Sequence, residues 1–283
     1  MNKIFCSTIL FFGLSLSLFS QTETIKDTLY LDVDNLKISK TTFNKKFYAA
    51  VFYSRAYYLD GIVINKISYQ YYFGKITPQK RKELQILINS KTNRNIKDNE
   101  NILIQYFDTL QGYQGQKRLY KKHYIDYHYQ IVENDTIYFT EYPPLTLKKF
   151  NTQRKKYQKK LTKCSIKLEK RKNTKVIEMY NIDTGYPFEL EKLTWLKDPG
   201  VFKKIFFKNM YESNLLIIKP NGDYFMKYSH IKDEDLFGLL KTDDWSQYKK
   251  DFEKSINTNS SVGYGIIKSL HSIYNGAHPK HCY

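Results

Sequence analysis

The sequence predicts a mixed α/β fold of the α+β kind, with a mixed sheet flanked by helices. From about residue 62 onward, runs rich in Val, Ile, Phe and Tyr alternate with segments of helical periodicity. Asn221-Gly222 lies between two apolar runs, and such a pair is the strongest short-range signal for a β-hairpin. The 283 residues are 41% hydrophobic and 16% aromatic, which provides enough apolar surface for a core and argues against disorder.

The first 20 residues form a separate segment. Lys3 precedes an uncharged, largely apolar run over residues 4–19, and the small residue Ser20 precedes Gln21. This pattern is typical of a secretory signal peptide, because the run is shorter than the about 20 residues that a transmembrane helix needs. We therefore expect cleavage near Ser20–Gln21, and an exported, periplasmic or secreted protein with no membrane-spanning segment after cleavage.

The elements before residue 108 follow from local patterns. Asp60-Gly61 separates two runs of β-forming residues and predicts a hairpin. Thr77-Pro78 predicts a helix start, because Thr is a good N-cap and Pro is favoured at the first helical position. The predicted elements are a strand over 28–33, a helix over 38–47, strands over 49–58 and 62–73, a helix over 77–91 and a strand over 102–107.

The C-terminal half continues the alternation, after an irregular segment over 108–147 that we expect to be a partly helical insertion following the central strand. Asp233, Glu234 and Asp235 open one of the later helices, where the helix dipole favours negative charge. The predicted elements are a helix over 148–175, a strand over 176–180, a helix over 198–207, strands over 215–218 and 224–228, and helices over 232–241, 245–255 and 266–273.

The helix predicted over 148–175 is strongly basic, with Glu169 as its sole acid. Phe150, Tyr157, Leu161, Cys164 and Leu168 recur at helical spacing and indicate a buried stripe. The lysines on the other side predict a surface for an anionic ligand, although a solvated surface without a ligand also explains them. The residues of this predicted surface are Lys155, Lys156, Lys159, Lys160, Lys163 and Lys167.

The chain has 46 Lys+Arg against 28 Asp+Glu and a formal net charge of +18. Only six of these cations are Arg, the residue that binds phosphates and guanine through two hydrogen bonds at once, so the composition argues against nucleic acid as the partner. High Lys, Asn, Ile and Tyr content is also typical of an AT-rich genome. We expect the partner to be an envelope protein or an anionic glycan or lipid surface.

Signal cleavage would remove Cys6 and leave Cys164 and Cys282. An oxidising compartment permits one disulfide between these two, but the place of Cys164 on the apolar stripe and of Cys282 near the chain end favours a buried thiol instead. His278, His281 and Cys282 could supply three zinc ligands, but a zinc site needs four ligands, or three and a water in a shaped cavity, and adjacent ligands at a chain end are a weak signal for one. No cofactor or metal is expected.

Two further groups of residues are candidate sites. Asp32 and Asp34 share one face of a strand and could act as a carboxylate pair, but such pairs more often border a turn. His123 and His128 could line a pocket among tyrosines, yet their spacing puts them on different helical faces. The chain has no Gly-rich phosphate loop, nucleophile elbow or His-Glu-x-x-His motif, so no catalytic residue is predicted.

The order of elements resembles the thioredoxin-like superfamily. The stretch Asn214-Leu-Leu-Ile-Ile-Lys-Pro-Asn-Gly-Asp-Tyr-Phe-Met-Lys-Tyr228 looks like the hairpin of its fourth and fifth strands, and residues 232–241 look like its closing helix. Residues 102–107 would then be the central strand that leads into the active site. The chain is also similar to uncharacterised exported proteins of Bacteroidetes, which imply no activity.

The departures from the superfamily are informative. Its redox Cys-x-x-Cys should follow the central strand, where this chain has Asp108 to Gln114, and its cis-proline should precede the fourth strand, where this chain has Glu212-Ser213-Asn214. Without a thiolate there is no nucleophile for disulfide exchange. The resemblance therefore implies a redox-inactive version of the fold.

The expected organisation is a signal peptide over 1–20, a β-rich extension over 21–61, a thioredoxin-like domain over 62–245 and a helical tail over 246–283. The leading functional hypothesis is an exported, non-catalytic binding protein that uses the lysine surface. The alternatives are a diverged envelope enzyme, either a thiol oxidoreductase or a hydrolase, and an envelope interaction or immunity-type protein. A reactive Cys164 would favour the oxidoreductase, whereas steeply salt-dependent binding would favour the binding protein.

Overall fold

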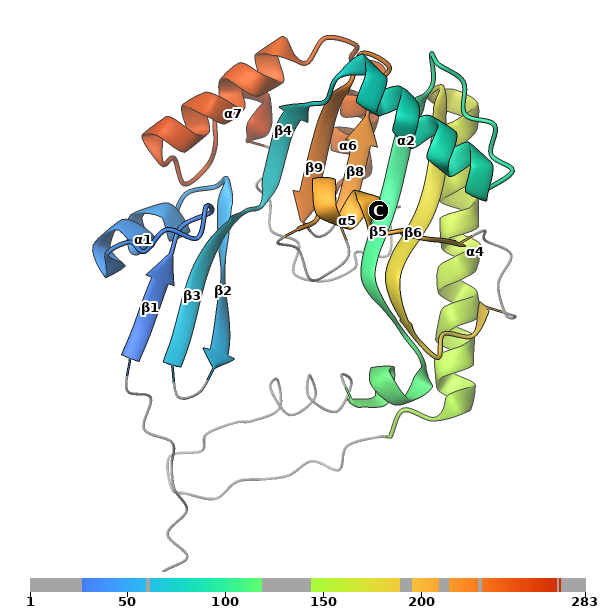
Figure 1. Ribbon diagram of the computed structural model, residues 1–283, viewed down its shortest axis with the longest axis horizontal. Coiled ribbons are helices and arrows are strands. Elements are labelled where there is room, and N and C mark those ends of the chain that lie inside the picture. The colour runs from blue at the N-terminus through green and yellow to red at the C-terminus, as the bar shows by residue number, and fades with distance from the viewer. Residues whose placement is uncertain are drawn as a thin grey trace, which may run out of the picture.

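Two β-sheets side by side form the framework of the molecule (Figure 1). The structure, a computed structural model, describes residues 27–59, 62–118, 144–188, 195–208, 214–228, 231–268 and 270. The expected signal peptide, the two weighed histidines at 123 and 128, most of the expected insertion and the C-terminal residues with Cys282 lie outside this part of the chain. Within it, no helix combines the length and the hydropathy that a membrane crossing requires.

The smaller sheet has the spatial order β1-β3-β2. Its strands are β1 (Asp27–Leu31), β2 (Phe52–Leu59) and β3 (Ile62–Tyr69). β2 and β3 pair antiparallel as the predicted hairpin, whereas β1 adds parallel to β3. Helix α1 (Lys40–Phe47) follows β1 within the range predicted as helical, 38–47, and its N-cap is Ser39, a residue type that favours this position. The extension expected to end at 61 therefore includes β3, because β3 is the central strand of this sheet.

The larger sheet has the spatial order β4-β9-β8-β5-β6-β7. Its strands are β4 (Tyr71–Lys75), β5 (Asn101–Gln111), β6 (Thr174–Thr184), β7 (Trp195–Lys197), β8 (Asn214–Ile218) and β9 (Asp223–Tyr228). β5 runs parallel to β6 and antiparallel to β8, and β9 is antiparallel to both β8 and β4. The predicted Asn221-Gly222 hairpin connects β8 to β9, and Gly222 has the positive φ of 85° that this turn requires.

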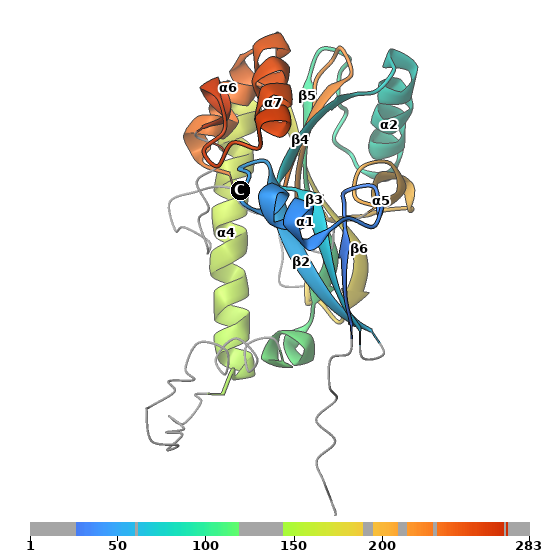
Figure 2. The same ribbon diagram turned by 90° about the vertical axis from the view of Figure 1, so that its left-hand side faces the viewer.

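Helices cover both faces of the larger sheet (Figure 2). One face carries α2 (Pro78–Lys91) and α5 (Val201–Ile205), which share a hydrophobic cluster with Ile104 of β5. The other face carries α4 (Leu147–Arg171), α6 (Asp233–Lys241) and α7 (Ser246–Thr258), which surround a second cluster with Leu103. Consecutive residues of β5 thus serve opposite cores, as the pleat of a strand requires. The predicted α+β class is confirmed.

Several predicted elements end elsewhere in the structure. The strands predicted to end at 107 and 180 each continue for four residues, to Gln111 in β5 and Thr184 in β6, so β5 extends into the start of the expected insertion. The run over 62–73 is divided at Gln70, where the chain leaves the smaller sheet as β3 and enters the larger one as β4.

The helix predicted over 148–175 ends at Arg171, because Asn173 adopts a left-handed conformation (φ 45°) and its carbonyl accepts from the backbone N–H of Asn101 at 2.9 Å. Asn is one of the few residues that tolerates this conformation at a helix end. Lys175 therefore belongs to β6.

The part of the chain after residue 245 is joined to the domain rather than separate from it. Trp245, Phe252, Ile267 and Leu270 are all buried in the cluster that also contains Phe73 of β4. The short 3-10 helix η2 (Gly265–Ile267) lies against α7. In the described residues, the segment expected to be a helical tail thus completes the core.

Candidate functional site

The C-terminal half of β5 is where the resemblance implies a pair of redox cysteines. Instead, Asp108 forms an ion pair with Lys203 of the α5 helix. Its Oδ1 also accepts a hydrogen bond from Asn181 Nδ2 at 3.3 Å. The Asp108 carboxylate, held by the Lys203 ammonium and the Asn181 amide, stabilises the packing of α5. It supplies no nucleophile for thiol chemistry.

A second carboxylate, that of Asp198, has a structural role on the face of the larger sheet that α5 covers. Its oxygens accept from the backbone N–H groups of Gly200, Phe202 and Lys203 at 3.0, 3.1 and 2.7 Å. They also accept from the Tyr106 hydroxyl at 3.0 Å. Burial and the neighbouring Asp198 charge raise the pKa of Tyr106 well above its usual value, so this hydroxyl remains a donor. These bonds explain why a helix begins just after Asp198, close to the predicted start at 198.

Helix α4 separates its apolar and basic residues as the sequence indicates. Phe150, Leu161 and Leu168 are 2% exposed or less and face the sheet. Of the predicted lysine surface, four residues are exposed and two are half-buried. Lys167 lies 4.6 Å above the ring centroid of Phe237 and 3.9 Å from a carboxylate oxygen of Asp233. We call the four exposed residues the lysine face: Lys155, Lys156, Lys159 and Lys163.

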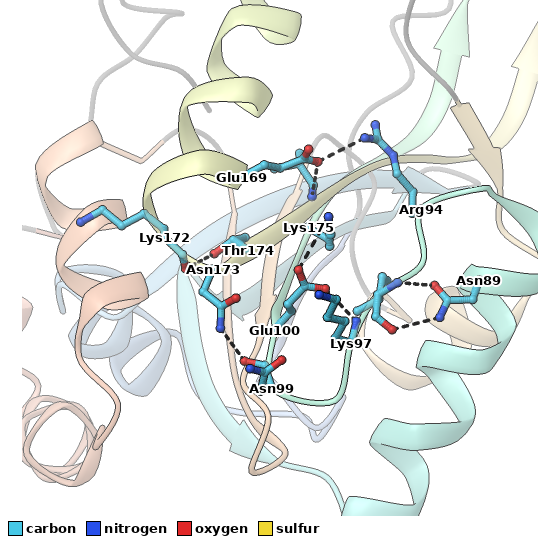
Figure 3. A network of polar contacts seen from close by, with 12 residues as sticks. Asn89, Arg94, Lys97, Asn99, Glu100, Glu169, Lys172, Asn173, Thr174 and Lys175 are labelled. Atoms are coloured by element: carbon cyan, nitrogen blue, oxygen red, sulfur yellow. Dashed lines mark hydrogen bonds and ion pairs between the residues drawn. The ribbon is translucent and has the colours of Figure 1, made fainter.

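Glu169, the sole acid of α4, is directed toward Arg94, which follows α2 in the sequence (Figure 3). Its Oε1 lies 3.2 Å from Arg94 Nη1 and accepts from the backbone N–H of Val176, also at 3.2 Å. Glu169 lies about 15 Å further along the helix axis than Lys159 and about 9 Å further than Lys163, and about 80° and 120° around the helix from them. The positive charge of the lysine face is therefore not balanced by any acid of its own helix.

The contacts around Glu169 belong to a network at the ends of α2 and α4 and the starts of β5 and β6 (Figure 3). Glu100 lies 3.6 Å from Lys175 and accepts from the backbone N–H of Lys97 at 2.7 Å. Asn173 donates to the carbonyl of Asn99 at 2.7 Å. The network ties loops to strand ends, and we assign it a structural role.

Cys164 lies on the buried stripe of α4 as predicted, with an exposed fraction of 7%. It is disulfide-bonded, however, so the expectation of a free buried thiol is wrong. The spacing of apolar residues places Cys164 on the buried side of the helix. It does not show which segment packs against that side, and so it could not predict the bond. The partner sulfur lies outside the described residues, and the pairing with Cys282 stays a prediction.

A cleft of about 410 Å³ opens between the smaller sheet, the β4–β9 edge of the larger sheet and α5 with the residues that follow it. The sequence does not predict this cleft, because its walls come from segments that are distant in the sequence. Among the lining residues, Asp34 alone is a candidate site residue by sequence. The lining residues are Val33, Asp34, Tyr53, Ser68, Tyr69, Tyr72, Ile205, Phe206, Lys208, Tyr224 and Met226.

Asp32 and Asp34, the candidate carboxylate pair, lie in different surroundings. Asp32 Oδ2 forms an ion pair with Lys46 at 2.6 Å, and its Oδ1 accepts from the backbone N–H of Val33 at 2.7 Å. Asp34 is exposed and lines the cleft. The two carboxylates thus have different partners, which argues against their acting as one acid–base pair.

Comparisons of the chain with protein-family models, with curated proteins and with solved structures found no match. Within the described ranges, no group of three or more His, Cys, Asp or Glu side chains could hold a metal ion. Two surfaces of the described residues are candidate binding sites, the lysine face and the cleft.

Proposed function

We propose that this protein is an exported, non-catalytic binding protein on a redox-inactive thioredoxin-like fold, and that its lysine face binds an anionic polysaccharide. The observation that carries the proposal is the exposure of four lysines on one side of α4 while the sole acid of that helix pairs with Arg94 on another side. Uncompensated positive charge of this kind attracts polyanions and releases their counterions on binding.

The order of the strands supports the thioredoxin-like part of the proposal. β5 is followed by α4 and a parallel β6, and the hairpin of β8 and β9 then adds antiparallel on the other side of β5. Helix α6 follows β9 and packs in the same cluster as α4. This is the arrangement that the resemblance implies for the core of the superfamily.

The spacing of the lysines favours a linear polyanion as the partner. Lys155, Lys159 and Lys163 follow one another at intervals of four residues, which corresponds to about 6 Å along the helix axis for each step. Acidic polysaccharides carry carboxylates at comparable intervals along an extended chain. Arg would be expected for forked contacts with phosphates, whereas Lys acts as a point charge and suits dispersed carboxylates.

Two features speak against the oxidoreductase alternative. The segment from Asp108 to Gln114 contains no cysteine, and Cys164 is both buried and disulfide-bonded. We therefore expect no turnover in an insulin-reduction assay. Turnover comparable to that of a true thioredoxin would overturn the non-catalytic part of the proposal.

Binding to immobilised polygalacturonate tests the lysine face. We compare the wild type with a variant in which the four lysines of the face are changed to Gln, which preserves helix propensity. The matched control removes four exposed lysines from other elements: Lys91→Gln, Lys204→Gln, Lys241→Gln and Lys250→Gln. Both variants lose four positive charges. A difference in affinity between them therefore depends on where the lysines lie and not on net charge.

We expect the lysine-face variant to bind at least about tenfold more weakly than the control variant at low salt, a difference of about 1.4 kcal/mol. Equal losses in the two variants would show that net charge alone attracts the polymer, and would contradict the proposal. Binding to vesicles of an anionic phospholipid without binding to polygalacturonate would contradict the choice of polysaccharide.

A further inference from the structure

The cleft between the two sheets has walls of aromatic side chains. Tyr53 and Tyr69 come from the smaller sheet, Tyr72 and Tyr224 from the larger sheet, and Phe206 from the residue that ends α5. Its volume of about 410 Å³ is within the range of small-molecule sites, which combine apolar and aromatic walls with a few polar groups. The walls therefore favour a ligand that carries a ring.

The tyrosine hydroxyls provide uncharged polar groups in the cleft. Burial and the neighbouring Tyr72 raise the pKa of Tyr224 to about 12. Burial, Tyr72 and the Asp34 and Asp32 carboxylates raise the pKa of Tyr69. Both hydroxyls stay protonated at neutral pH and can donate to an oxygen of a ligand.

Gly74 makes room for one of these rings. It lies directly opposite Tyr224 in the pairing of β4 with β9, and a Cβ atom at this position would overlap the Tyr224 ring. The absence of a side chain allows that ring to lie across β4, on the sheet face that lines the cleft. The shape of the cleft thus depends on this glycine.

Two charged residues line the cleft, Lys208 and Asp34, and a third, Lys66, is buried in the wall next to it. Lys208 and Asp34 are exposed lining residues. Lys66 is 8% exposed and lies two residues before Ser68 on β3, so both project from the same face of the strand. Lys66 is not itself a lining residue, but the charges of the lining residues Asp34 and Lys208 both affect its pKa, and its neighbour on that strand face, Ser68, lines the cleft.

Lys66 is a buried cation without a matching anion. Within the described residues it forms no ion pair, and burial lowers its pKa, with only the Asp34 charge acting in the opposite direction. A buried charge is costly unless it is paired. A ligand anion at this end of the cleft would offset that cost, whereas a neutral ligand would not.

We propose that the cleft binds a small aromatic carboxylate, with its ring among the tyrosines and its carboxylate facing Lys66 and Lys208. The site is separate from the lysine face of α4, and neither proposal depends on the other. The balance of charge determines the choice of ligand class, because two cations, Lys66 and Lys208, lie near a single carboxylate, that of Asp34. The polar tyrosine hydroxyls favour a ring that itself carries a polar substituent.

Calorimetric titration with three probes tests the inference. The probes are 4-hydroxyphenylacetate, the neutral alcohol with the same ring (4-hydroxyphenylethanol), and acetate, which has no ring. Each is titrated into the wild type, Lys66→Met and Lys208→Gln, with Lys204→Gln as the control. Lys204 is also exposed and precedes Lys208 by four residues, but it does not line the cleft.

We expect saturable binding of 4-hydroxyphenylacetate, with the alcohol at least about tenfold weaker and acetate without measurable binding. Lys66→Met should weaken binding of the carboxylate at least about tenfold and leave that of the alcohol unchanged. Met matches the stem of Lys and removes an unpaired buried charge, so this variant should fold and melt no lower than the wild type. Lys208→Gln should weaken carboxylate binding less, because that ammonium is exposed, and Lys204→Gln should not weaken it.

Three outcomes would overturn the inference. The first is no saturable binding of 4-hydroxyphenylacetate by the wild type. The second is equal affinity for the carboxylate and the alcohol, which would show a purely apolar cleft. The third is carboxylate binding by a folded Lys66→Met protein that matches the wild type.

Discussion

The rings of Tyr53 and Tyr228 stack face to face, with centroids 4.3 Å apart and planes 6° apart. Tyr53 belongs to the smaller sheet and Tyr228 ends β9 of the larger one. The Tyr228 hydroxyl also accepts from Arg55 at 3.3 Å, and its backbone N–H donates to the carbonyl of Gln70 at 2.8 Å. Tyr228 thus connects the two sheets at the edge of the cleft.

We expect this stack to couple the two sheets energetically. In a double-mutant cycle of Tyr53→Ala and Tyr228→Ala, the coupling should be about 1 kcal/mol, as is typical of aromatic pairs. Urea unfolding monitored by circular dichroism measures it. Tyr58→Ala, at a 77% exposed position of the same strand, is the control and should show no coupling to Tyr228→Ala. A coupling free energy between Tyr53→Ala and Tyr228→Ala that is zero within error would contradict the energetic coupling of the two sheets through this stack.

Two glycine substitutions should have opposite effects. Gly74→Ala would place a Cβ atom in the Tyr224 ring, and the overpacking should lower the free energy of unfolding by about 1–3 kcal/mol. Gly238→Ala, within α6, meets only the Tyr248 hydroxyl at 3.6 Å and should raise that energy by up to about 1 kcal/mol through helix propensity. Thermal unfolding of both variants checks this. A Gly74→Ala protein as stable as the wild type would show that the ring moves freely.

Lys227 makes the stability of the protein dependent on pH. Burial lowers its pKa from 10.5 to about 8, with only the Asp235 charge opposing the shift. Below pH 8 both the folded and the unfolded state bind the proton, so the full cost of the buried ammonium, about 3 kcal/mol, is present. Between about pH 8 and 10.5 the unfolded state binds more protons, so stability rises with pH in that window.

Lys227→Met should therefore be more stable than the wild type at pH 7, with a difference that shrinks as the pH approaches 10. Urea unfolding of both proteins at pH 7, 8.5 and 9.5 measures this difference. Lys241→Met, at an exposed position, is the control and should differ little from the wild type at each pH. A constant difference for Lys227→Met would contradict the burial of a charged ammonium at this site.

The disulfide of Cys164 has a predicted partner. We expect non-reducing peptide mapping of the exported protein to recover the Cys164 peptide linked to that of Cys282, with no alkylation until a reductant is added. A loop of more than about 100 residues gives about 4–5 kcal/mol in the chain-entropy model, so reduction should lower the melting temperature clearly. A link to Cys6 would contradict signal cleavage, and label uptake by Cys164 without reductant would contradict the bond itself.

Local sequence signals predicted most helices and hairpins. Ser39, Thr77 and Asn221-Gly222 each act through bonds or angles within a few residues, and each predicted boundary is close to the observed one. The end of α4 at Arg171 was not predicted, because the run of lysines continues past it. Asn173, two residues further on, is the signal that indicates this end.

Elements that depend on distant partners could not be predicted. Gln70 divides the run over 62–73 because its N–H donates to the Val51 carbonyl and its carbonyl accepts from Tyr228, two residues far away in sequence. The three residues of β7 form a strand only because β6 lies beside them. The cleft was missed for the same reason, and so was Lys66, whose burial depends on how the two sheets meet.

The salt dependence of polygalacturonate binding tests the central claim most directly. Each neutralised charge steepens the fall of log K with log salt concentration, so the wild type should show a slope of about −2 to −4. The variant with Gln at all four positions of the lysine face should have a slope near zero, whereas the control variant should keep the wild-type slope. Slopes that are the same for the lysine-face variant and the control variant would contradict the account.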